Sequence, residues 1–366
     1  MALALKEAKK GTPSPNPHVG AVITREGKLL AEGFHARAGL AHAEIVAMDK
    51  IGAECRGATL YVTLEPCNHH GRTGPCTDAI LAAGIERVVI GCSDPMPHVP
   101  GAIEKLEQAG ISVEVGVLDY QARQLVAGFV KHRRTGLPHV TLKAAVSLDG
   151  RIASRSGQAR WLTGDKARKE AHALRAAVDC VLVGVRTVLA DDPELTVRHV
   201  PGSQPVRVVL DSNLRTPTSA RLFQGRGSAV WIMHGAHAPE GKKQDLTQLG
   251  AQLFMMPESP HGLSVPSVLR LLGDRGMQSV MVEGGAAVYN SFLRQECVER
   301  MAIFVAPVLM GDPQAPSLAA FREVVGMGEV TRLGEVHVRR FGPDVLIEGD
   351  ILERLSSMHG HGAHAD

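Results

Sequence analysis

One short set of residues constrains this chain more than any other feature. His42-Ala43-Glu44 is followed by two cysteines, Cys67 and Cys76, that each come directly after a proline. One imidazole and two thiolates suit Zn²⁺, and three protein ligands leave the fourth tetrahedral position open, as in catalytic zinc sites. Because these ligands are distant in sequence, we expect the N-terminal part of the chain to form one domain that brings them together.

Glu44 is the acidic residue of this set that zinc binding does not require. In the H-x-E…P-C-x-x-C signature of zinc deaminases, the glutamate transfers a proton from the water to the departing amine. A purely structural zinc site has no need for such a carboxylate. We therefore predict that His42, Cys67 and Cys76 bind catalytic Zn²⁺ and that Glu44 is the catalytic acid and base.

The spacing of the two cysteines departs from the short form of that signature. Eight residues separate Cys67 from Cys76, where the short form has two. The insert is polar and contains His69 and Arg72, whose side chains are suited to binding a phosphorylated substrate over the open metal position. The strand-like segment 58–64 runs directly into this region.

Length and composition limit the class of protein. The chain has 366 residues, which suits two domains. A net charge of +2 does not indicate the strongly basic surface that is typical of nucleic-acid-binding proteins. The N-terminus lacks the apolar region of a secretory signal, and no window has the roughly 18 apolar residues of a membrane span. Six cysteines are too few for a disulfide framework. We expect a cytoplasmic protein that binds neither nucleic acid nor membrane.

Strand and helix signals alternate along the chain and place a domain boundary near residue 136. The first part predicts an α/β sandwich with zinc ligands at helix N-termini, where the helix dipole favours thiolate. We expect domains at 1–136 and 137–356 and a disordered tail at 357–366. Strands are predicted at 19–24, 29–32, 58–64, 87–92, 111–117, 139–146, 180–185, 206–210, 230–233 and 279–282, with antiparallel strands at 302–306, 336–340 and 345–350. Helices are predicted from residue 42, and over 77–83, 102–109, 119–133, 166–177, 265–272 and 286–294.

Two features of the second part have more than one interpretation. Gly284-Gly285 lies between an apolar strand and a helix, where small residues expose backbone N–H groups that are able to hold a phosphate. Such a pair alone is weak evidence for a phosphate site. Trp161, one of two tryptophans, is either a stacking surface or part of the core. The residues alone favour the core.

Several longer motifs together resemble one family. They are Pro15-Asn16-Pro17-His18-Val19-Gly20, the segment 63–72 around Cys67, Ser147-Leu148-Asp149-Gly150 and Val188-Leu189-Ala190-Asp191-Asp192-Pro193. With them, nearly the whole chain resembles the bifunctional deaminase/reductase of riboflavin biosynthesis. The resemblance implies a cytidine-deaminase-like α/β/α domain followed by a dihydrofolate-reductase-like α/β domain.

The resemblance also implies two consecutive reactions on a small phosphorylated pyrimidine. The first is zinc-dependent hydrolytic deamination of 2,5-diamino-6-(5-phosphoribosylamino)pyrimidin-4(3H)-one. The second is NADPH-dependent reduction of its ribosyl side chain to ribityl. Zn²⁺ and NADPH are the implied cofactors, and we expect a homo-oligomer, either a dimer or a tetramer.

Individual site residues are implied by the same resemblance. Ala159 occupies a position where the family usually has a substrate-binding serine. The deaminase substrate is assigned to Asn16, His69 and Arg72. NADPH is assigned to Ala145, Trp161, Thr187, Asp191, Ser212, Gly285, Ala286, Ala287, Val288, Tyr289, Asn290 and Ser291, and the reductase substrate to Lys143, Ala159, Thr163, Leu195, Arg198 and Glu283.

Two other hypotheses remain at this point. The chain could be a zinc nucleoside or base deaminase with an unrelated C-terminal domain, or a non-enzymatic scaffold held together by zinc. The near-neutral charge and the long insert argue against a polynucleotide substrate. Glu44 argues against the scaffold, because a structural zinc ion needs no uncommitted carboxylate beside it.

Overall fold

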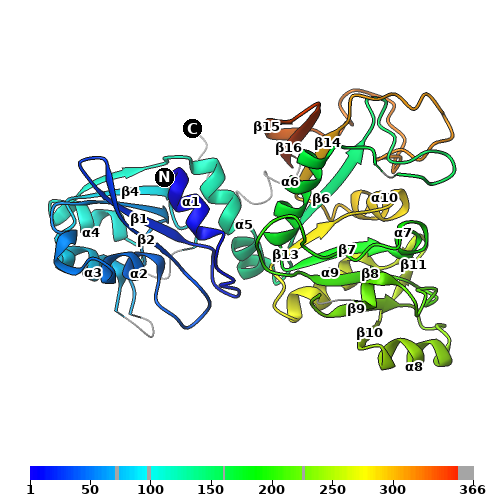
Figure 1. Ribbon diagram of the computed structural model, residues 1–366, viewed down its shortest axis with the longest axis horizontal. Helices are drawn as coiled ribbons and strands as arrows, with labels where there is room; N and C mark the ends of the chain where they lie inside the picture. Colours follow the sequence, from blue (N-terminus) through cyan, green and yellow to red (C-terminus); the bar gives the residue numbers. More distant parts are fainter. Residues whose placement is uncertain (71–73, 97–99, 160, 225–226, 353–366) are drawn as a thin grey trace, which may run out of the picture. The chain divides into compact units, whose positions relative to one another are not determined.

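The computed structural model describes residues 1–70, 74–96, 100–159, 161–224 and 227–352. The chain divides into two compact units, Met1–Gly136 and Leu137–Asp366 (Figure 1). Residues 353–366, which include the predicted tail, lie outside the described residues. Among the described helices, none has both the length and the apolar character needed to cross a membrane.

Unit 1 contains a five-stranded sheet in the order β2-β1-β3-β4-β5. β1 pairs antiparallel with β2 and β3, whereas β3, β4 and β5 are parallel. The hairpin formed by β1 and β2 turns at Glu26-Gly27. Both residues have positive φ, as in two-residue turns whose twist matches that of the flanking strands. The strands are β1 Gly20–Arg25, β2 Lys28–Phe34, β3 Thr59–Leu64, β4 Arg87–Cys92 and β5 Ser112–Val115.

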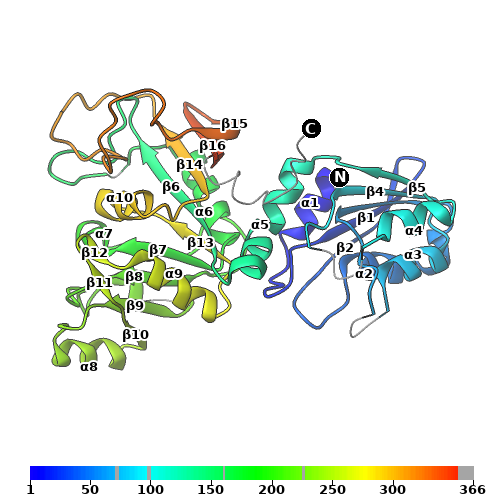
Figure 2. The same cartoon turned by 180° about the vertical axis from the view of Figure 1, so that it is seen from behind.

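Helices cover both faces of this sheet. On one face lie α2 Ala43–Asp49, α3 Cys76–Ala83 and α4 Ala102–Gln108, with the short helix η1 Gly52–Cys55, and on the other lie α1 Ala2–Ala8 and α5 Asp119–Thr135 (Figure 2). Glycines allow close packing, because a Cβ at Gly20 would lie 2.1 Å from the Ala4 oxygen and one at Gly33 would lie 2.3 Å from the Ala43 oxygen. The predicted α/β/α sandwich is confirmed.

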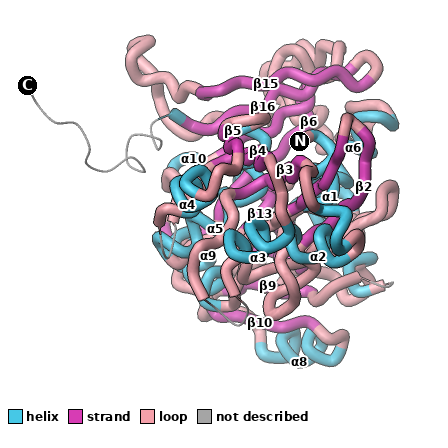
Figure 3. Tube along the Cα trace, turned by 90° about the vertical axis from the view of Figure 1, so that its left-hand side faces the viewer, coloured by secondary structure: helices cyan, strands magenta, loops and turns pink. Residues whose placement is uncertain are grey.

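Unit 2 is built on a nine-stranded sheet in the order β10-β9-β8-β7-β13-β6-β14-β16-β15. The strands from β10 to β14 in this order are parallel, and β16 and β15 complete one edge in antiparallel pairing. β15 and β10 lie at opposite edges of the sheet (Figure 3). A separate two-stranded ribbon pairs β11 Glu258–Ser259 with β12 Gly262–Leu263. The sheet strands are β6 His139–Val146, β7 Cys180–Gly184, β8 Val206–Leu210, β9 Val230–His234, β10 Ala251–Met255, β13 Ser279–Val282, β14 Arg300–Val305, β15 Leu333–Phe341 and β16 Asp344–Ile351.

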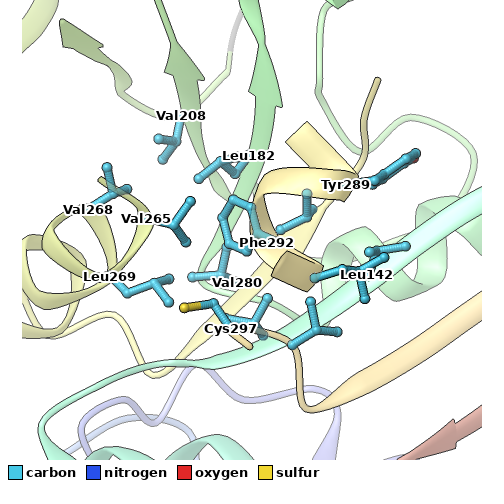
Figure 4. Packing of buried hydrophobic residues seen from close by; sticks show 14 of the residues in the cluster. Leu142, Leu182, Val208, Val265, Val268, Leu269, Val280, Tyr289, Phe292 and Cys297 are labelled. Atoms are coloured by element: carbon cyan, nitrogen blue, oxygen red, sulfur yellow. The ribbon is translucent and has the colours of Figure 1, made fainter. Parts of the chain in front are cut away.

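The parallel strands of unit 2 are buried on both faces, which explains their continuous apolar sequences. Leu182 contributes to the core beneath α9 Val265–Asp274 and α10 Ala286–Arg294, where Phe292 is fully buried (Figure 4). Its neighbours Val181 and Val183 contribute to the core of the opposite face. That face is covered by α6 Asp165–Ala176, α7 Val185–Asp191, η2 Arg221–Phe223 and α8 Glu240–Gln248.

Most predicted elements agree with the structure, and the strands at 87–92, 139–146, 206–210 and 279–282 coincide with β4, β6, β8 and β13. The prediction for 302–306 was partly wrong. The corresponding strand, β14, is antiparallel only to β16 and runs parallel to β6 on its other side. The helices α1, α7 and α8 and the strand β10 were not predicted. α7 follows β7 without a loop, and α8 is mostly polar, so neither has a clear apolar period.

Candidate functional site

The three predicted zinc ligands of unit 1 come together in space. His42 caps the N-terminus of α2, Cys76 is the first residue of α3, and Cys67 lies in the loop after β3, so only two of the three are at helix N-termini. Their ligand atoms all lie within 4.8 Å of one another. His42 Nδ1 is 3.2 Å from Cys76 Sγ and 3.5 Å from Cys67 Sγ. Zinc with its usual bond lengths and tetrahedral angles separates N and S ligands by about 3.5 Å, so these residues fit the ion.

The electrostatic environment of this cluster suits metal-assisted proton transfer. The hydrogen bond from the Cys76 thiol lowers the pKa of Cys67, and the backbone N–H of Cys76 donates to Cys67 Sγ at 3.3 Å, so Cys67 is disposed to be a thiolate. Glu44, in the first turn of α2, is only 3% exposed. Burial raises the pKa of Glu44, while His42 opposes the rise. A carboxylate with a raised pKa is a better proton acceptor near neutral pH.

A second histidine connects a predicted substrate residue to the cluster. His35 is 3% exposed, and its ring lies edge-on to the ring of His42 with 5.4 Å between centroids. Its Nδ1 is 3.0 Å from the Ala41 oxygen, so Nδ1 carries the proton and donates there. Nε2 then accepts from Asn16 Nδ2 at 3.0 Å. His35 was not predicted, because a histidine that follows an edge strand has no signature of its own.

The loop between the two cysteines is anchored by Asn68. Its Oδ1 accepts from Thr77 Oγ1 and from Lys105 Nζ, both at 3.1 Å, and its Nδ2 donates to the Pro100 oxygen at 3.3 Å. His69, the next residue, is half-buried. Arg72 lies outside the described residues. The described part of the insert is therefore held against α3 and α4 at its start.

Unit 2 contains a cavity of about 620 Å³ at the carboxyl ends of β6, β7, β8 and β13. Its volume is typical of a small-molecule site, and open α/β sheets bind ligands at this edge. Most of the residues that the resemblance assigned to NADPH and to the reductase substrate line this cavity. They are Lys143, Ala145, Ala159, Thr187, Asp191, Ser212, Glu283, Gly285, Ala286, Ala287, Val288, Tyr289 and Ser291.

Two predicted residues near the start of α6 do not line the cavity. Trp161 is 70% exposed, so the interpretation as a core residue is wrong. The Arg168 guanidinium stacks on its ring, 4.3 Å from the centroid. Arg168 also donates to the Thr163 carbonyl oxygen at 2.8 Å, so this arginine ties both residues to α6.

Three further predicted residues also lie outside the cavity lining. Leu195 is buried in the core of the face that α7 covers. Arg198 forms an ion pair with Glu194 at 2.9 Å. Asn290 accepts a hydrogen bond from the Ala320 backbone at 2.8 Å. These contacts give all three residues a structural role.

Glu283 is the centre of a charged network at one end of the cavity. Arg175 binds it in bidentate fashion, with Nε and Nη2 at 2.8 and 2.9 Å from the two carboxylate oxygens, and Lys143 Nζ lies 3.5 Å away. Burial acts to raise the pKa of Glu283, but Arg175 and Lys143 together lower it to about 2. Arg175, 9% exposed, was missed, because α6 contains two arginines, Arg168 and Arg175, and its sequence does not show which one is buried.

Gly284-Gly285 leads from β13 into α10, and Gly285 is the N-cap residue. Its N–H donates to Thr187 Oγ1 at 3.1 Å. A Cβ at Gly184 would lie 2.6 Å from Val288, so a glycine there lets α10 approach β7 closely. The first N–H groups of a helix have no intrahelical partners, and those of Ala286 and Ala287 belong to cavity-lining residues. This helix end is suited to binding a phosphate group.

Comparison with known proteins shows the same two-part organisation. Residues 1–92 match the family described as the cytidine and deoxycytidylate deaminase zinc-binding region, and residues 138–347 match the RibD C-terminal domain. The riboflavin biosynthesis protein RibD of Bacillus amyloliquefaciens is 41% identical over 94% of this chain and 93% of its own length. The corresponding protein of Aquifex aeolicus is 40% identical over 95% and 96%. This chain belongs to the RibD family.

Solved RibD structures extend the similarity to three dimensions. Acinetobacter baumannii RibD superimposes with a TM-score of 0.76 at 36% identity and covers 96% of this chain and 97% of its own. A Thermotoga maritima protein described as a diaminohydroxyphosphoribosylaminopyrimidine deaminase/5-amino-6-(5-phosphoribosylamino)uracil reductase gives a TM-score of 0.76 at 35% identity, with the same coverage. RibD proteins are bifunctional enzymes of riboflavin biosynthesis. Because the C-terminal half is a RibD domain, the hypothesis of an unrelated C-terminal domain is wrong.

Proposed function

We propose that this chain catalyses two consecutive steps of riboflavin biosynthesis, one in each unit. Unit 1 removes the 2-amino group of the phosphorylated diaminopyrimidinone by hydrolysis, and unit 2 reduces the ribosyl side chain to ribityl with NADPH. The observation that supports this proposal best is the presence of both sites in one RibD-family chain: a three-ligand cluster with a buried glutamate, and a cavity of about 620 Å³ lined by residues assigned to NADPH and to the reductase substrate.

In the deaminase site, His42, Cys67 and Cys76 would hold the zinc ion. When bound, zinc lowers the pKa of a water molecule to about 7 and so makes it nucleophilic at neutral pH. Glu44 accepts the proton from the water on its carboxylate and passes it to the departing amine. Burial of Glu44 excludes solvent, which would otherwise exchange that proton.

Substrate orientation in unit 1 is assigned to Asn16, His69 and Arg72. Because His35 accepts from Asn16 Nδ2, it fixes the amide orientation and leaves one N–H and Oδ1 of Asn16 for an edge of the pyrimidine. His69 and Arg72 are suited to the phosphate group. This arrangement binds a small nucleotide-like substrate.

In the reductase site, NADPH would supply the hydride, and its pyrophosphate would lie against the N–H groups of α10 after Gly284-Gly285. Lys143 and Glu283 lie on the neighbouring strand ends β6 and β13, where they would orient the sugar. Arg175 holds the Glu283 carboxylate in one rotamer through two hydrogen bonds. We retain the assignment of Arg198 and Ala159 to binding of the reductase substrate.

We also propose a homo-oligomeric, cytoplasmic enzyme. Leu309, Val325, Met327 and Val338 are exposed apolar side chains of unit 2, which contact between copies of the chain would cover. Four cysteines outside the zinc cluster, Cys55, Cys92, Cys180 and Cys297, are buried free thiols, as expected in a reducing compartment. Analytical ultracentrifugation of the full chain would give the oligomeric state.

A coupled assay tests the proposed function. The purified, zinc-loaded chain is given the phosphorylated diaminopyrimidinone with NADPH, and ammonia release and nicotinamide absorbance are followed together. We expect one ammonia released and one NADPH oxidised for each substrate consumed. A chelator should stop ammonia release from the diamino compound while reduction of the already deaminated compound continues. Ammonia release without zinc, or NADPH oxidation that stops with the metal while the chain stays folded, would contradict the two-site assignment.

A further inference from the structure

Two arginines of the cavity in unit 2 have no role in the reaction described above. Arg186 lies in α7, just after β7, and Arg215 lies in the loop after β8. Both are exposed, and both line the cavity. Within the described part of the chain, neither has a hydrogen-bond or ion-pair partner. The third fixed cation of the described lining, Lys143, is paired with Glu283.

The loop that carries Arg215 is anchored at its base. Asp211, fully buried, accepts hydrogen bonds from the backbone N–H and the Oγ1 of Thr216, both at 2.7 Å. Leu214 is buried in the core beside it. These contacts fix the loop and leave Ser212, Asn213 and Arg215 as its cavity-lining residues.

The order of the strands places these arginines at one end of the site. Across the sheet the order is β8-β7-β13-β6. Lys143 and Ala145 mark the β6 end, and Gly284-Gly285 follows β13 in the middle. Arg186 and Arg215 follow β7 and β8 at the far end. With roughly 4.8 Å between adjacent strands, β6 and β8 are about 14 Å apart.

A dinucleotide bound across this edge has a defined direction. Its pyrophosphate lies against the N-terminus of α10 in the middle, and its nicotinamide lies toward β6, where the substrate residues are. The adenosine half therefore lies over the ends of β7 and β8. The 2′-phosphate on that ribose is the group that distinguishes NADPH from NADH, and arginine is the preferred partner of phosphate because it donates two parallel hydrogen bonds.

We propose that Arg186 and Arg215 bind the 2′-phosphate of NADPH and thereby determine the preference of unit 2 for NADPH over NADH. Ser212 and Asn213 supply neighbouring hydrogen-bond donors on the same loop. The assignment rests on the proposed reductase function of this cavity.

Nucleotide binding, measured by isothermal titration calorimetry on the full chain, tests this proposal without turnover. The variants are Arg186→Gln, Arg215→Gln and the double variant. Arg270→Gln is the matched control, because Arg270 is an exposed arginine of α9 that does not line the cavity. Each single substitution should weaken NADPH binding about tenfold and the double substitution about 100-fold, since hydrogen bonds to a charged group are lost. NADH affinity should change less than about threefold.

A competition experiment separates this proposal from the reductase assignment. Adenosine 2′,5′-bisphosphate should displace NADPH from the wild-type chain and from Arg270→Gln but should bind the double variant much more weakly. Arg215→Lys should retain part of the NADPH preference, because the charge remains. Equal weakening of NADPH and NADH, or no weakening of either, would overturn the 2′-phosphate assignment while leaving the reductase function intact. Failure of the folded wild-type chain to bind either nucleotide would instead overturn the reductase function itself.

Discussion

The zinc cluster and the cavity differ in how much of the chain each requires. The zinc cluster takes its ligands from His42 to Cys76 and brings their binding atoms within 4.8 Å. The cavity draws its lining from Lys143 to Pro316 and spans the ends of four strands. A metal site works through a few fixed distances, whereas a dinucleotide site works through an extended surface. We therefore expect a single substitution of a zinc ligand in unit 1 to abolish activity. Single substitutions around the cavity of unit 2 should instead reduce binding or activity in part.

The largest effect is expected for Cys67→Ser. A serine hydroxyl is a poor zinc ligand at neutral pH, so the variant should lose the metal and all detectable deamination. Metal analysis and ammonia release measure the two effects. Cys92→Ser is the matched control, because Cys92 is a buried free thiol of the same unit whose donor bond to Thr63 a serine is able to replace. Zinc retained by Cys67→Ser would mean that the cluster has another ligand.

The substitution Glu44→Gln distinguishes zinc binding from deamination in unit 1. The amide keeps the size of the buried side chain but cannot accept a proton, so deamination should fall by a factor of about 10² to 10⁴ while zinc stays bound. Reduction of the deaminated compound should be unchanged. Loss of zinc comparable to that of Cys67→Ser would identify Glu44 as a ligand and remove its assignment as the proton carrier.

Arg175→Met should have a graded effect in unit 2. It leaves Glu283 buried with only Lys143 beside it, and breaking a buried ion pair destabilises a fold by about 3 to 5 kcal/mol. Both tryptophans, Trp161 and Trp231, lie in unit 2, so fluorescence during urea unfolding reports on this unit. A second substitution, Glu283→Gln, should recover part of the loss. An unchanged midpoint for Arg175→Met would show that the pair adds nothing to stability.

The same ion pair predicts a pH dependence. The pKa of Glu283 falls from an ordinary 4.5 to about 2 in the fold, so the native chain binds fewer protons than the unfolded chain between these values. The resulting stability, about 3 kcal/mol, is fully present above pH 4.5 and is lost as the pH falls toward 2. The difference in unfolding free energy between wild type and Glu283→Gln should therefore shrink over that range. A constant difference would contradict the shift.

The smallest effect is expected for Ala159→Ser. Ala159 lines the cavity and lacks the hydroxyl that the family usually presents to the substrate. The serine should lower the KM of the deaminated substrate by up to about tenfold, the value of one hydrogen bond to a charged group, with kcat nearly unchanged. Arg198→Ala, measured beside it at saturating NADPH, should raise the same KM strongly. An unchanged KM for Arg198→Ala would show that the phosphate is held elsewhere.

The sequence alone determined the parts of this protein that depend on local spacing. The H-x-E motif and the two Pro-Cys pairs predict zinc ligands, because a metal restricts which residue types are acceptable, and the structure brings these three residues together. The strands β6, β8 and β13 were predicted at their observed limits because buried parallel strands are continuous apolar runs between turn residues. Gly284-Gly285 was recognised as a candidate phosphate site because it lies between an apolar strand and a helix.

Only the tertiary structure decided the features that depend on partners distant in the chain. His35 gains its role from Asn16 and Ala41, Arg175 from a carboxylate 108 positions away, and Arg186 and Arg215 from the alignment of β7 with β8. Trp161 is 70% exposed, and its ring stacks on Arg168 outside the core. The type of a side chain limits what it is able to bind. Its burial and its neighbours depend on packing against segments that are distant in the sequence, so a local sequence pattern does not predict them.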